Sequence, residues 1–177
     1  NEGEAVTITV VATDSDSDTA DLEYGFDFDN DGDFSDDRIQ PAPTTTYTFP
    51  NAGVFRTGVR VSDGDGGVTT TTVDITVVNI APTVTLNGPT SAVEGESVTF
   101  NCSGLDQGNA FLAIDWDMTG DGLFERPNTR DQIDYAFPNE GTYEIRCRVR
   151  DGLGAAAEAR QTVYVSNVLP TVTANFG

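Results

Sequence analysis

The chain has 177 residues, with 29 acidic residues against 9 basic ones and a formal net charge of −20. Such a surface repels nucleic acid and anionic membranes, whereas it attracts cations or keeps the chain soluble. The sequence contains no histidine and no lysine, which excludes the usual base of a nucleophilic triad, Schiff-base chemistry and histidine-ligated zinc. The same acidity would also suit a saline habitat, and composition alone does not separate the two explanations.

Membrane insertion is not expected from the sequence. No apolar run approaches the roughly 18 residues that a spanning helix needs. Residues 1–4 do not resemble a signal peptide.

The first half of the chain is a series of short segments in which apolar and polar residues alternate and β-branched residues are common. This pattern predicts strands with one buried face. The predicted strands cover residues 4–12, 22–28, 44–49, 54–61 and 68–78, with turn signals at residues 50–53 and 62–67. No segment shows convincing helical periodicity.

The second half repeats this order of segments. The matching pairs are 2–7 with 94–99, 47–53 with 135–141, 61–64 with 149–152, and 77–82 with 165–170. The sequence therefore predicts an all-β fold of two tandem β-sandwich domains, residues 1–80 and 81–168. Pro82 restricts the chain to an extended path at the hinge between them.

An acidic loop follows an aromatic residue in each half. In the first loop, oxygen-bearing side chains occupy alternate positions and a glycine follows, which is the pattern that a hard cation such as calcium requires. The predicted ligands are Asp27, Asp29, Asp31 and the backbone carbonyl of Asp33, with Asp36 or Asp37 closing the shell. The alternative is an Asp-rich turn kept for hydrogen bonding and solubility.

The second loop offers Asp117, Thr119, Asp121 and Glu125 as calcium ligands. Because Thr119 replaces a carboxylate, we expect a lower charge and a weaker affinity than in the first loop. Position twelve is Arg38 in one loop and Asn128 in the other, so neither loop is a complete EF-hand.

Three motifs of the second half resemble those of PKD-type repeats: Trp-Asp-x-x-Gly-Asp-Gly at 116–122, Tyr-x-Phe-Pro-x-x-Gly at 135–141 and Val-x-Asp-Gly at 149–152. The resemblance covers nearly the whole chain and occurs twice. It implies tandem immunoglobulin-like β-sandwiches of an extracellular protein. Repeats of this family serve as spacers, adhesive modules and accessory domains of secreted hydrolases, so the resemblance says little about function.

The resemblance also implies a role for the two cysteines. Cys102 and Cys147 would face inward from opposite sheets, with Trp116 on the intervening strand. We expect a disulfide, which indicates an oxidising, extracytoplasmic setting; the alternative is two buried thiols. The first domain has Val10 and Val59 at the positions that correspond to the two cysteines, so its core must be stabilised by packing alone.

The acidic residues cluster on one loop per domain, whereas a glycosidase needs two opposed acids across a cleft. We therefore expect a non-enzymatic structural or adhesive segment of a secreted or cell-surface protein or extracellular fibre. Calcium would stiffen the joint between the domains, with independent acidic turns as the alternative. The second hypothesis is an accessory module of a secreted hydrolase that binds a cell-surface glycan or protein, although Trp116, the only tryptophan, is expected in the core.

Residues 169–175 copy the first strand of the second domain, at 83–86, for which the first domain has no counterpart. The favoured interpretation is a segment cut from a longer array, in which neighbouring repeats are the partners. The alternative is that this strand completes the first domain of a neighbouring chain, giving a head-to-tail fibre.

Overall fold

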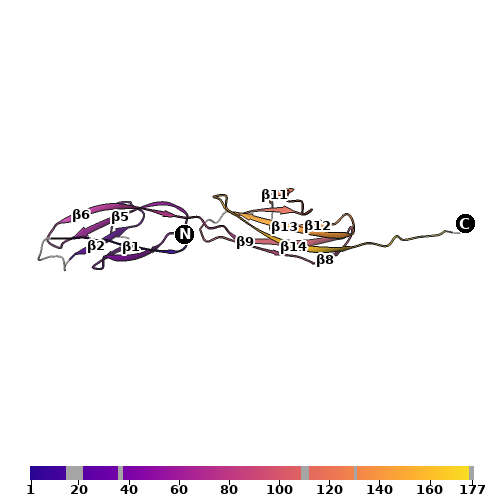
Figure 1. The fold of residues 1–177 in the computed structure, drawn as a ribbon, viewed down its shortest axis with the longest axis horizontal. Coiled ribbons are helices and arrows are strands. Elements are labelled where there is room, and N and C mark those ends of the chain that lie inside the picture. The colour runs from indigo at the N-terminus through magenta and orange to yellow at the C-terminus, as the bar shows by residue number, and fades with distance from the viewer. Residues whose placement is uncertain (15–21, 36–37, 109–111, 130, 176–177) are drawn as a thin grey trace. The chain divides into compact units, whose positions relative to one another are not determined.

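The computed structural model describes residues 1–14, 22–35, 38–108, 112–129 and 131–175. They form two compact units, Asn1–Ile80 (unit 1) and Ala81–Gly177 (unit 2), and each unit is a sandwich of two β-sheets (Figure 1). The predicted all-β fold of two tandem domains is confirmed, since the described residues contain strands and no helix. None of the described segments could therefore cross a membrane as a helix.

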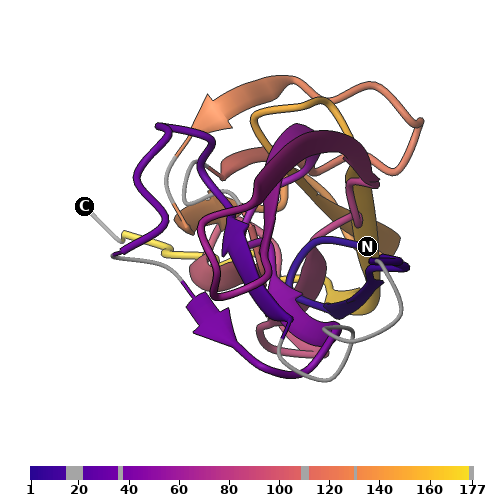
Figure 2. The same cartoon turned by 90° about the vertical axis from the view of Figure 1, so that its left-hand side faces the viewer.

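Unit 1 consists of a two-stranded and a four-stranded sheet, with strand orders β1–β4 and β3–β2–β5–β6. Its strands are β1 (Ala5–Thr9), β2 (Glu23–Asp27), β3 (Arg38–Gln40), β4 (Thr44–Thr48), β5 (Gly53–Ser62) and β6 (Val68–Val77). All neighbouring strands are antiparallel. Figure 2 draws the strands of unit 1 in indigo to magenta.

Aromatic residues dominate the core of unit 1. Phe26 is fully buried in β2, and it packs with Ile8, Tyr24 and Val59 in one cluster. The ring of Phe28 stacks on Tyr47 at a centroid distance of 3.9 Å. Because the strand pleat turns alternate residues inward, the alternation that predicted these strands also selects this core.

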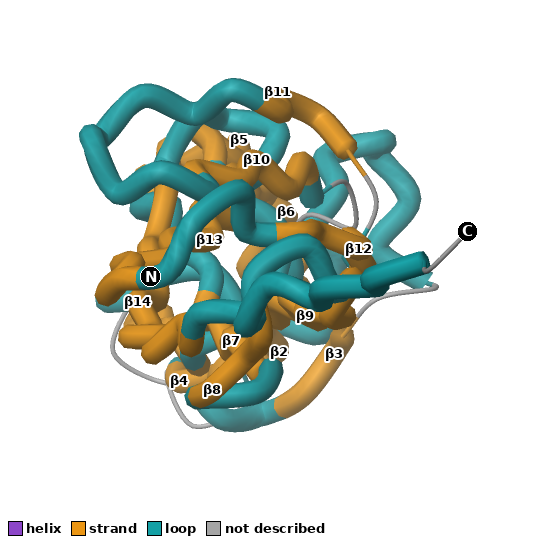
Figure 3. The backbone as a smooth tube through the Cα atoms, turned by 90° about the vertical axis from the view of Figure 1, so that its right-hand side faces the viewer, coloured by secondary structure: helices purple, strands orange, loops and turns teal. Residues whose placement is uncertain are grey.

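Unit 2 has the same arrangement with two additional strands. Its strands are β7 (Thr83–Asn87), β8 (Ser91–Val93), β9 (Ser97–Leu105), β10 (Ala113–Asp117), β11 (Arg126–Thr129), β12 (Gln132–Ala136), β13 (Gly141–Arg150) and β14 (Ala156–Ser166). The sheets have the orders β12–β9–β7 and β11–β10–β13–β14–β8, with β8 parallel to β14. Figure 3 draws the strands in orange and the connecting loops in teal. Strands β9 to β14 correspond in order to β1 to β6, whereas β7 and β8 have no counterpart in the described part of unit 1.

A disulfide joins Cys102 on β9 to Cys147 on β13, in opposite sheets and with their Cα atoms 6.3 Å apart. Both residues are buried beside Trp116, which is itself fully buried on β10. The predicted disulfide and the inward orientation of Trp116 are therefore both present.

The sequence prediction missed the three- and four-residue strands β3, β8 and β11, which are too short to show alternation. The predicted strand 4–12 is also shorter, since β1 ends at Thr9. The amide of Val10 still donates to the Pro43 carbonyl at 2.8 Å, but proline has no N–H to return the bond, so the ladder stops there.

A buried glutamate connects the start of unit 1 to its end. Glu2 is fully buried, and its carboxylate accepts hydrogen bonds from the amides of Ala52 at 3.1 Å and Ile80 at 2.8 Å. Its own amide donates to the Val78 carbonyl at 3.0 Å. One side chain thus fixes the turn before β5 and the last residues of the unit.

Unit 2 repeats this clasp. The Glu94 carboxylate accepts from the amides of Glu140 at 3.0 Å and Val168 at 2.9 Å. Gly3 and Gly95, which follow the two glutamates, have φ values of 71° and 77°, a conformation that glycine adopts without steric cost. Two residues of the repeated Glu-Gly-Glu motif therefore have structural roles. The first glutamate accepts the two amides, and the glycine adopts the positive φ that the turn requires.

We predict that Glu2→Ala lowers the free energy of unfolding of unit 1 by about 2–3 kcal/mol, because two partly buried amides lose a charged acceptor. Glu4→Ala is the control, since Glu4 is exposed and its carboxylate makes surface contacts with Asn1: an ion pair with the N-terminus at 3.7 Å and a hydrogen bond from the Asn1 side-chain amide at 3.1 Å. Its effect should be within about 0.5 kcal/mol. Equal effects of the two substitutions in chemical denaturation would contradict the clasp.

Reduction of the disulfide should destabilise unit 2 and leave unit 1 unchanged. The two cysteines are 45 residues apart, for which the chain-entropy model gives about 4 kcal/mol. Denaturant unfolding followed at Trp116, with and without reductant, measures the loss in unit 2. The Cys102→Ser/Cys147→Ser double variant should behave like the reduced protein, and an unchanged unfolding midpoint would contradict the prediction.

Candidate cation-binding loops

The first acidic loop is built around Asp27, the last residue of β2. Its side chain is buried, and its two carboxylate oxygens accept hydrogen bonds from the amides of Asn30 and Gly32, the latter at 2.9 Å. Asn30 and Gly32 have positive φ values of 59° and 90°, which let the backbone curl around the carboxylate. A buried carboxylate is tolerated when it accepts such bonds.

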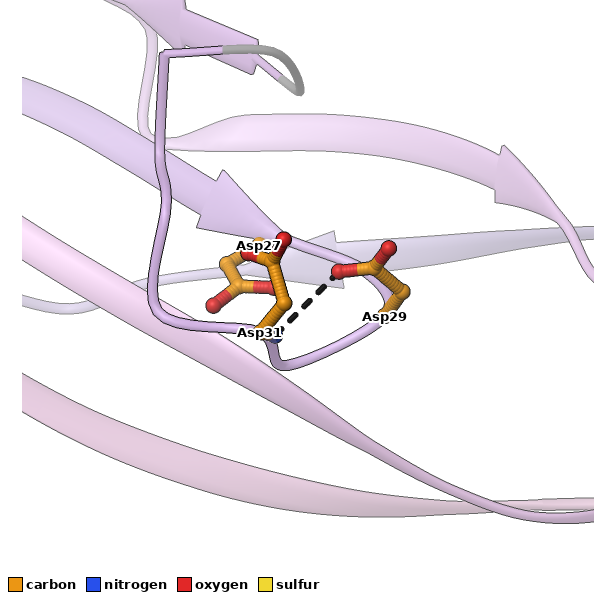
Figure 4. A group of neighbouring side chains, drawn as sticks. All are labelled: Asp27, Asp29 and Asp31. Carbon is orange, nitrogen blue, oxygen red and sulfur yellow. Dashed lines mark hydrogen bonds between the residues drawn. The ribbon is translucent and has the colours of Figure 1, made fainter.

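The acidic residues after Asp27 form a series of turns in which each carboxylate accepts the amide two residues later. The bonds run from Asp31 to Asp29 at 3.2 Å, from Asp33 to Asp31 at 2.7 Å and from Ser35 to Asp33 at 2.8 Å. Figure 4 shows the first of these bonds and the side chains of Asp27, Asp29 and Asp31 on the same side of the loop.

These three aspartates lie close enough to share one cation. One carboxylate oxygen from each of Asp27, Asp29 and Asp31 lies within 4.8 Å of the others. The Asp33 carboxylate instead accepts from the hydroxyl and amide of Ser35, which lowers the pKa of Asp33. Asp36 and Asp37 lie outside the described residues.

The second loop has the same backbone design. Asp117 at the end of β10 is fully buried, and its carboxylate accepts the amides of Thr119, Gly120 and Gly122 at 3.1, 2.6 and 2.9 Å. The group of oxygens within 4.8 Å consists of Asp117, Asp121 and Glu125. The predicted residues of both loops are thus mostly brought together.

Thr119 makes a hydrogen bond within the second loop. Its hydroxyl lies 2.6 Å from the Glu125 carboxylate, to which it donates, and Glu125 also accepts the Met118 amide at 3.1 Å. Glu125 therefore closes the second loop by hydrogen bonding to its first residues, and one of its oxygens already serves the Thr119 hydroxyl.

The two loops differ in the residue that faces the buried aspartate from the neighbouring strand. Asp117 pairs with Arg146 on β13, whose Nε lies 3.8 Å from the Asp117 carboxylate and whose Nη2 donates to the Gly120 carbonyl at 3.4 Å. Asp27 pairs with Gly58 on β5. The second loop thus has a guanidinium beside its carboxylates, whereas glycine supplies no charge beside the first.

A buried ion pair that the sequence analysis missed lies near the second loop. Asp115 on β10 is fully buried and accepts hydrogen bonds from Arg148 at 2.9 Å and from Arg150 at 2.8 and 3.0 Å. The bonds to Asp115 raise the pKa of Arg150. The guanidinium of Arg148 also lies 3.9 Å from the ring centroid of Phe124, the last residue of the loop motif.

In unit 1, Gly25 takes the place of Asp115, with the ring of Phe34 close above it. A Cβ at Gly25 would lie 3.0 Å from the Phe34 ring. The only sequence signal for the Asp115 cluster is the alternation of arginines at 146, 148 and 150 on β13, which places them on one face of the strand.

Comparison with known families agrees with this architecture. Residues 1–77 match one model of the PKD domain, and residues 79–166 match a second PKD domain model. The chain therefore belongs to the PKD domain family, whose members are non-catalytic modules with an immunoglobulin-like fold.

Similar proteins include a collagenase, ColQ1 from Bacillus cereus (strain Q1), which is 31% identical over 90 residues. The match covers 50% of this chain but only 9% of the collagenase, so the chain spans a small part of that protein.

Two similar solved structures are single PKD domains. One belongs to an M14-like peptidase from Thermoplasmatales archaeon SCGC AB-540-F20, with 19% identity and a TM-score of 0.43 over 50% of this chain and 98% of that one. The other is the PKD1 domain of the Vibrio cholerae metalloprotease PrtV, with 26% identity and a TM-score of 0.39 over 49% of this chain and 98% of that one.

The buried aspartates should be structural requirements whether or not a cation binds. Asp117→Ala leaves three loop amides without their acceptor, and we expect it to lower the free energy of unfolding of unit 2 by about 3 kcal/mol. Asp121→Ala is the matched control, because Asp121 is exposed and accepts only the Leu123 amide. It should cost about 0.5 kcal/mol. Equal losses for the two variants would contradict this assignment.

Proposed function

We propose that this chain is a non-catalytic structural segment of an extracellular or cell-surface protein, and that calcium bound at the Asp27 loop stiffens the joint between its domains. The observation that carries the proposal is the convergence of Asp27, Asp29 and Asp31 within 4.8 Å. Carboxylates this close repel one another unless a cation neutralises them, and calcium prefers oxygen ligands from a short, curled loop.

The position of the loop within unit 1 supports a stiffening role. Asp27 pairs with Gly58 near the middle of β5, and the same strand begins at Gly53 opposite Val77, where β6 ends. The loop therefore extends toward the end of the sandwich at which the chain leaves the unit. A cation there would order the loop at the same end of unit 1 at which Glu2 accepts the amide of the last residue of the unit.

Calcium should bind the first loop more tightly than the second. The second loop has Thr119 in place of a carboxylate and the Arg146 guanidinium 3.8 Å from Asp117, and a cation near the same carboxylates competes with a second one. Extracellular location is supported by the disulfide, which persists in oxidising compartments, and by the match to part of a collagenase.

Thermal and denaturant unfolding in calcium, in magnesium and in chelator tests the proposal. Calcium at 100 times its dissociation constant should stabilise unit 1 by about 2.7 kcal/mol, and magnesium should do less because it demands a more regular shell. The Asp29→Asn/Asp31→Asn variant should lose the effect. Asp65→Asn/Glu4→Gln removes the same charge elsewhere on unit 1 and should keep it.

The proposal is wrong if calcium leaves the unfolding of unit 1 unchanged, or if the control variant loses the effect as fully as the loop variant. In the first case the acidic loops are solvated turns held by Asp27 and Asp117. In the second case calcium acts only through the net charge of −20.

The similarity to a collagenase favours a second candidate, an accessory binding module of a hydrolase. Sedimentation with insoluble collagen and with insoluble polysaccharides distinguishes the two functions. A structural segment should stay in the supernatant with every matrix, whereas an accessory module should be retained by one of them. The buried Trp116 is not available for stacking on a sugar.

A further inference from the structure

Unit 2 holds a guanidinium against its acidic loop. Arg146 on β13 pairs with Asp117, and its Nε lies 3.8 Å from the Asp117 carboxylate. Its Nη2 donates to the Gly120 carbonyl at 3.4 Å. The residue opposite Arg146 on β14 is a second arginine, Arg160. One planar group thus reaches a carboxylate and a carbonyl at once, which suits the fork of a guanidinium better than the single point of an ammonium.

Unit 1 has small residues at both arginine positions. In the same register Asp27 pairs with Gly58 on β5, and Gly58 pairs with Thr72 on β6. A hollow of about 460 Å³ lies beside Gly58. Its lining includes Asp27, Asn30, Asp31 and Phe34 from the loop, and Thr71 and Thr72 from β6. Since β2, β5 and β6 correspond to β10, β13 and β14, this hollow lies at the position of the two arginines of unit 2.

The oxygen acceptors that bind Arg146 in unit 2 have counterparts in the hollow. Asp27 corresponds to Asp117, is only 2% exposed and lines the hollow. The ion pairs formed by the described residues of unit 1 involve Glu4 and Asp74, not Asp27. Asn30, which corresponds to Gly120, also lines the hollow and supplies the matching backbone carbonyl. The carboxylate and the carbonyl are therefore present without the guanidinium.

An aromatic ring completes the set of groups that recognise a guanidinium. Phe34 lines the same hollow, and the face of an aromatic ring attracts organic cations. In unit 2 the corresponding residue, Phe124, has the Arg148 guanidinium 3.9 Å from its ring centroid. Unit 1 also carries 16 acidic residues and 3 arginines, so its electrostatic field draws basic partners toward it.

We propose that the hollow beside Gly58 binds an arginine side chain of a partner protein. The guanidinium lies against the Asp27 carboxylate and donates to the Asn30 carbonyl, as Arg146 does to Asp117 and Gly120 in unit 2. Charge-assisted hydrogen bonds of this kind are the stronger ones and select guanidinium by its geometry. This inference goes beyond the calcium site and does not rest on it.

NMR titration of the full chain, in chelator, with the blocked peptide acetyl-Gly-Arg-Gly-amide tests the proposal. The amide signals of Gly32, Gly58 and Thr72 should shift saturably. The Gly122 signal of unit 2 should stay in place, because Arg146 occupies the corresponding position there. The same peptide with citrulline in place of arginine keeps the shape without the charge, and it should bind at least about tenfold more weakly.

Two matched variants locate the site. Thr72→Arg puts a guanidinium of the chain itself at the hollow and should abolish the shifts. Thr76→Arg adds the same charge further along β6 and should leave them unchanged. Both threonines are exposed, so neither variant threatens the fold.

A third variant transfers the site to unit 2. Arg146→Gly/Arg160→Thr gives unit 2 the small residues of unit 1, and peptide binding should then also shift the Gly122 signal. The same spectrum reports whether unit 2 remains folded, and the threonine variants decide the proposal if it does not. A folded double variant without a second site would overturn the correspondence with Arg146.

Three further outcomes would overturn the proposal. The first is the absence of saturable shifts in unit 1, and the second is equal binding of the arginine and citrulline peptides. The third is an equal effect of Thr72→Arg and Thr76→Arg, or wild-type shifts at Gly122 as large as those at Gly58. In that case the peptide binds the acidic surface in general, not the hollow.

Discussion

Asp27 and Asp117 each lie at the end of a core strand, with their carboxylate oxygens occupied by amides of the loop that follows. A buried carboxylate is stable only where such donors replace water. The hydrogen bonds to the buried carboxylate therefore fix the backbone of each acidic loop. The exposed carboxylates that follow are held in position because they accept amides of the same curled backbone. These hydrogen bonds hold the carboxylate oxygens close together, and a bound cation would relieve the repulsion that remains among them.

The two domains share this design but reach stability in different ways. Unit 2 contains a disulfide, an arginine beside the buried loop aspartate, and a buried aspartate that binds two further arginines. Strand β7 also covers one edge of its core. Unit 1 has Val10 and Val59 in place of the cysteines and Gly58 in place of Arg146. The loop after β2, where Gly58 supplies no charge beside the buried Asp27, is the place where we propose that calcium binds.

The features of the fold that could be predicted from the sequence are those that produce short-range or repeated patterns. Alternation identified the long strands, the repeat identified the tandem domains and the acidic loops, and the resemblance to PKD-type repeats implied the inward cysteines. It did not predict the Glu2 clasp, because the amides that Glu2 binds lie 50 and 78 residues away. It also missed that Asp115 binds arginines 33 and 35 residues later. Spacing placed Thr119 among the predicted ligands, and it did not reveal that the Thr119 hydroxyl donates to Glu125.

Calorimetric titration of the full chain with calcium tests the central claim most directly. The account predicts one tight site per chain, lost in Asp29→Asn/Asp31→Asn and retained in Asp121→Asn, because the second loop has the Arg146 guanidinium beside its buried aspartate, whereas Gly58 stands at that position beside the first. The absence of binding heat, or two equivalent sites of which only one responds to each variant, would contradict it.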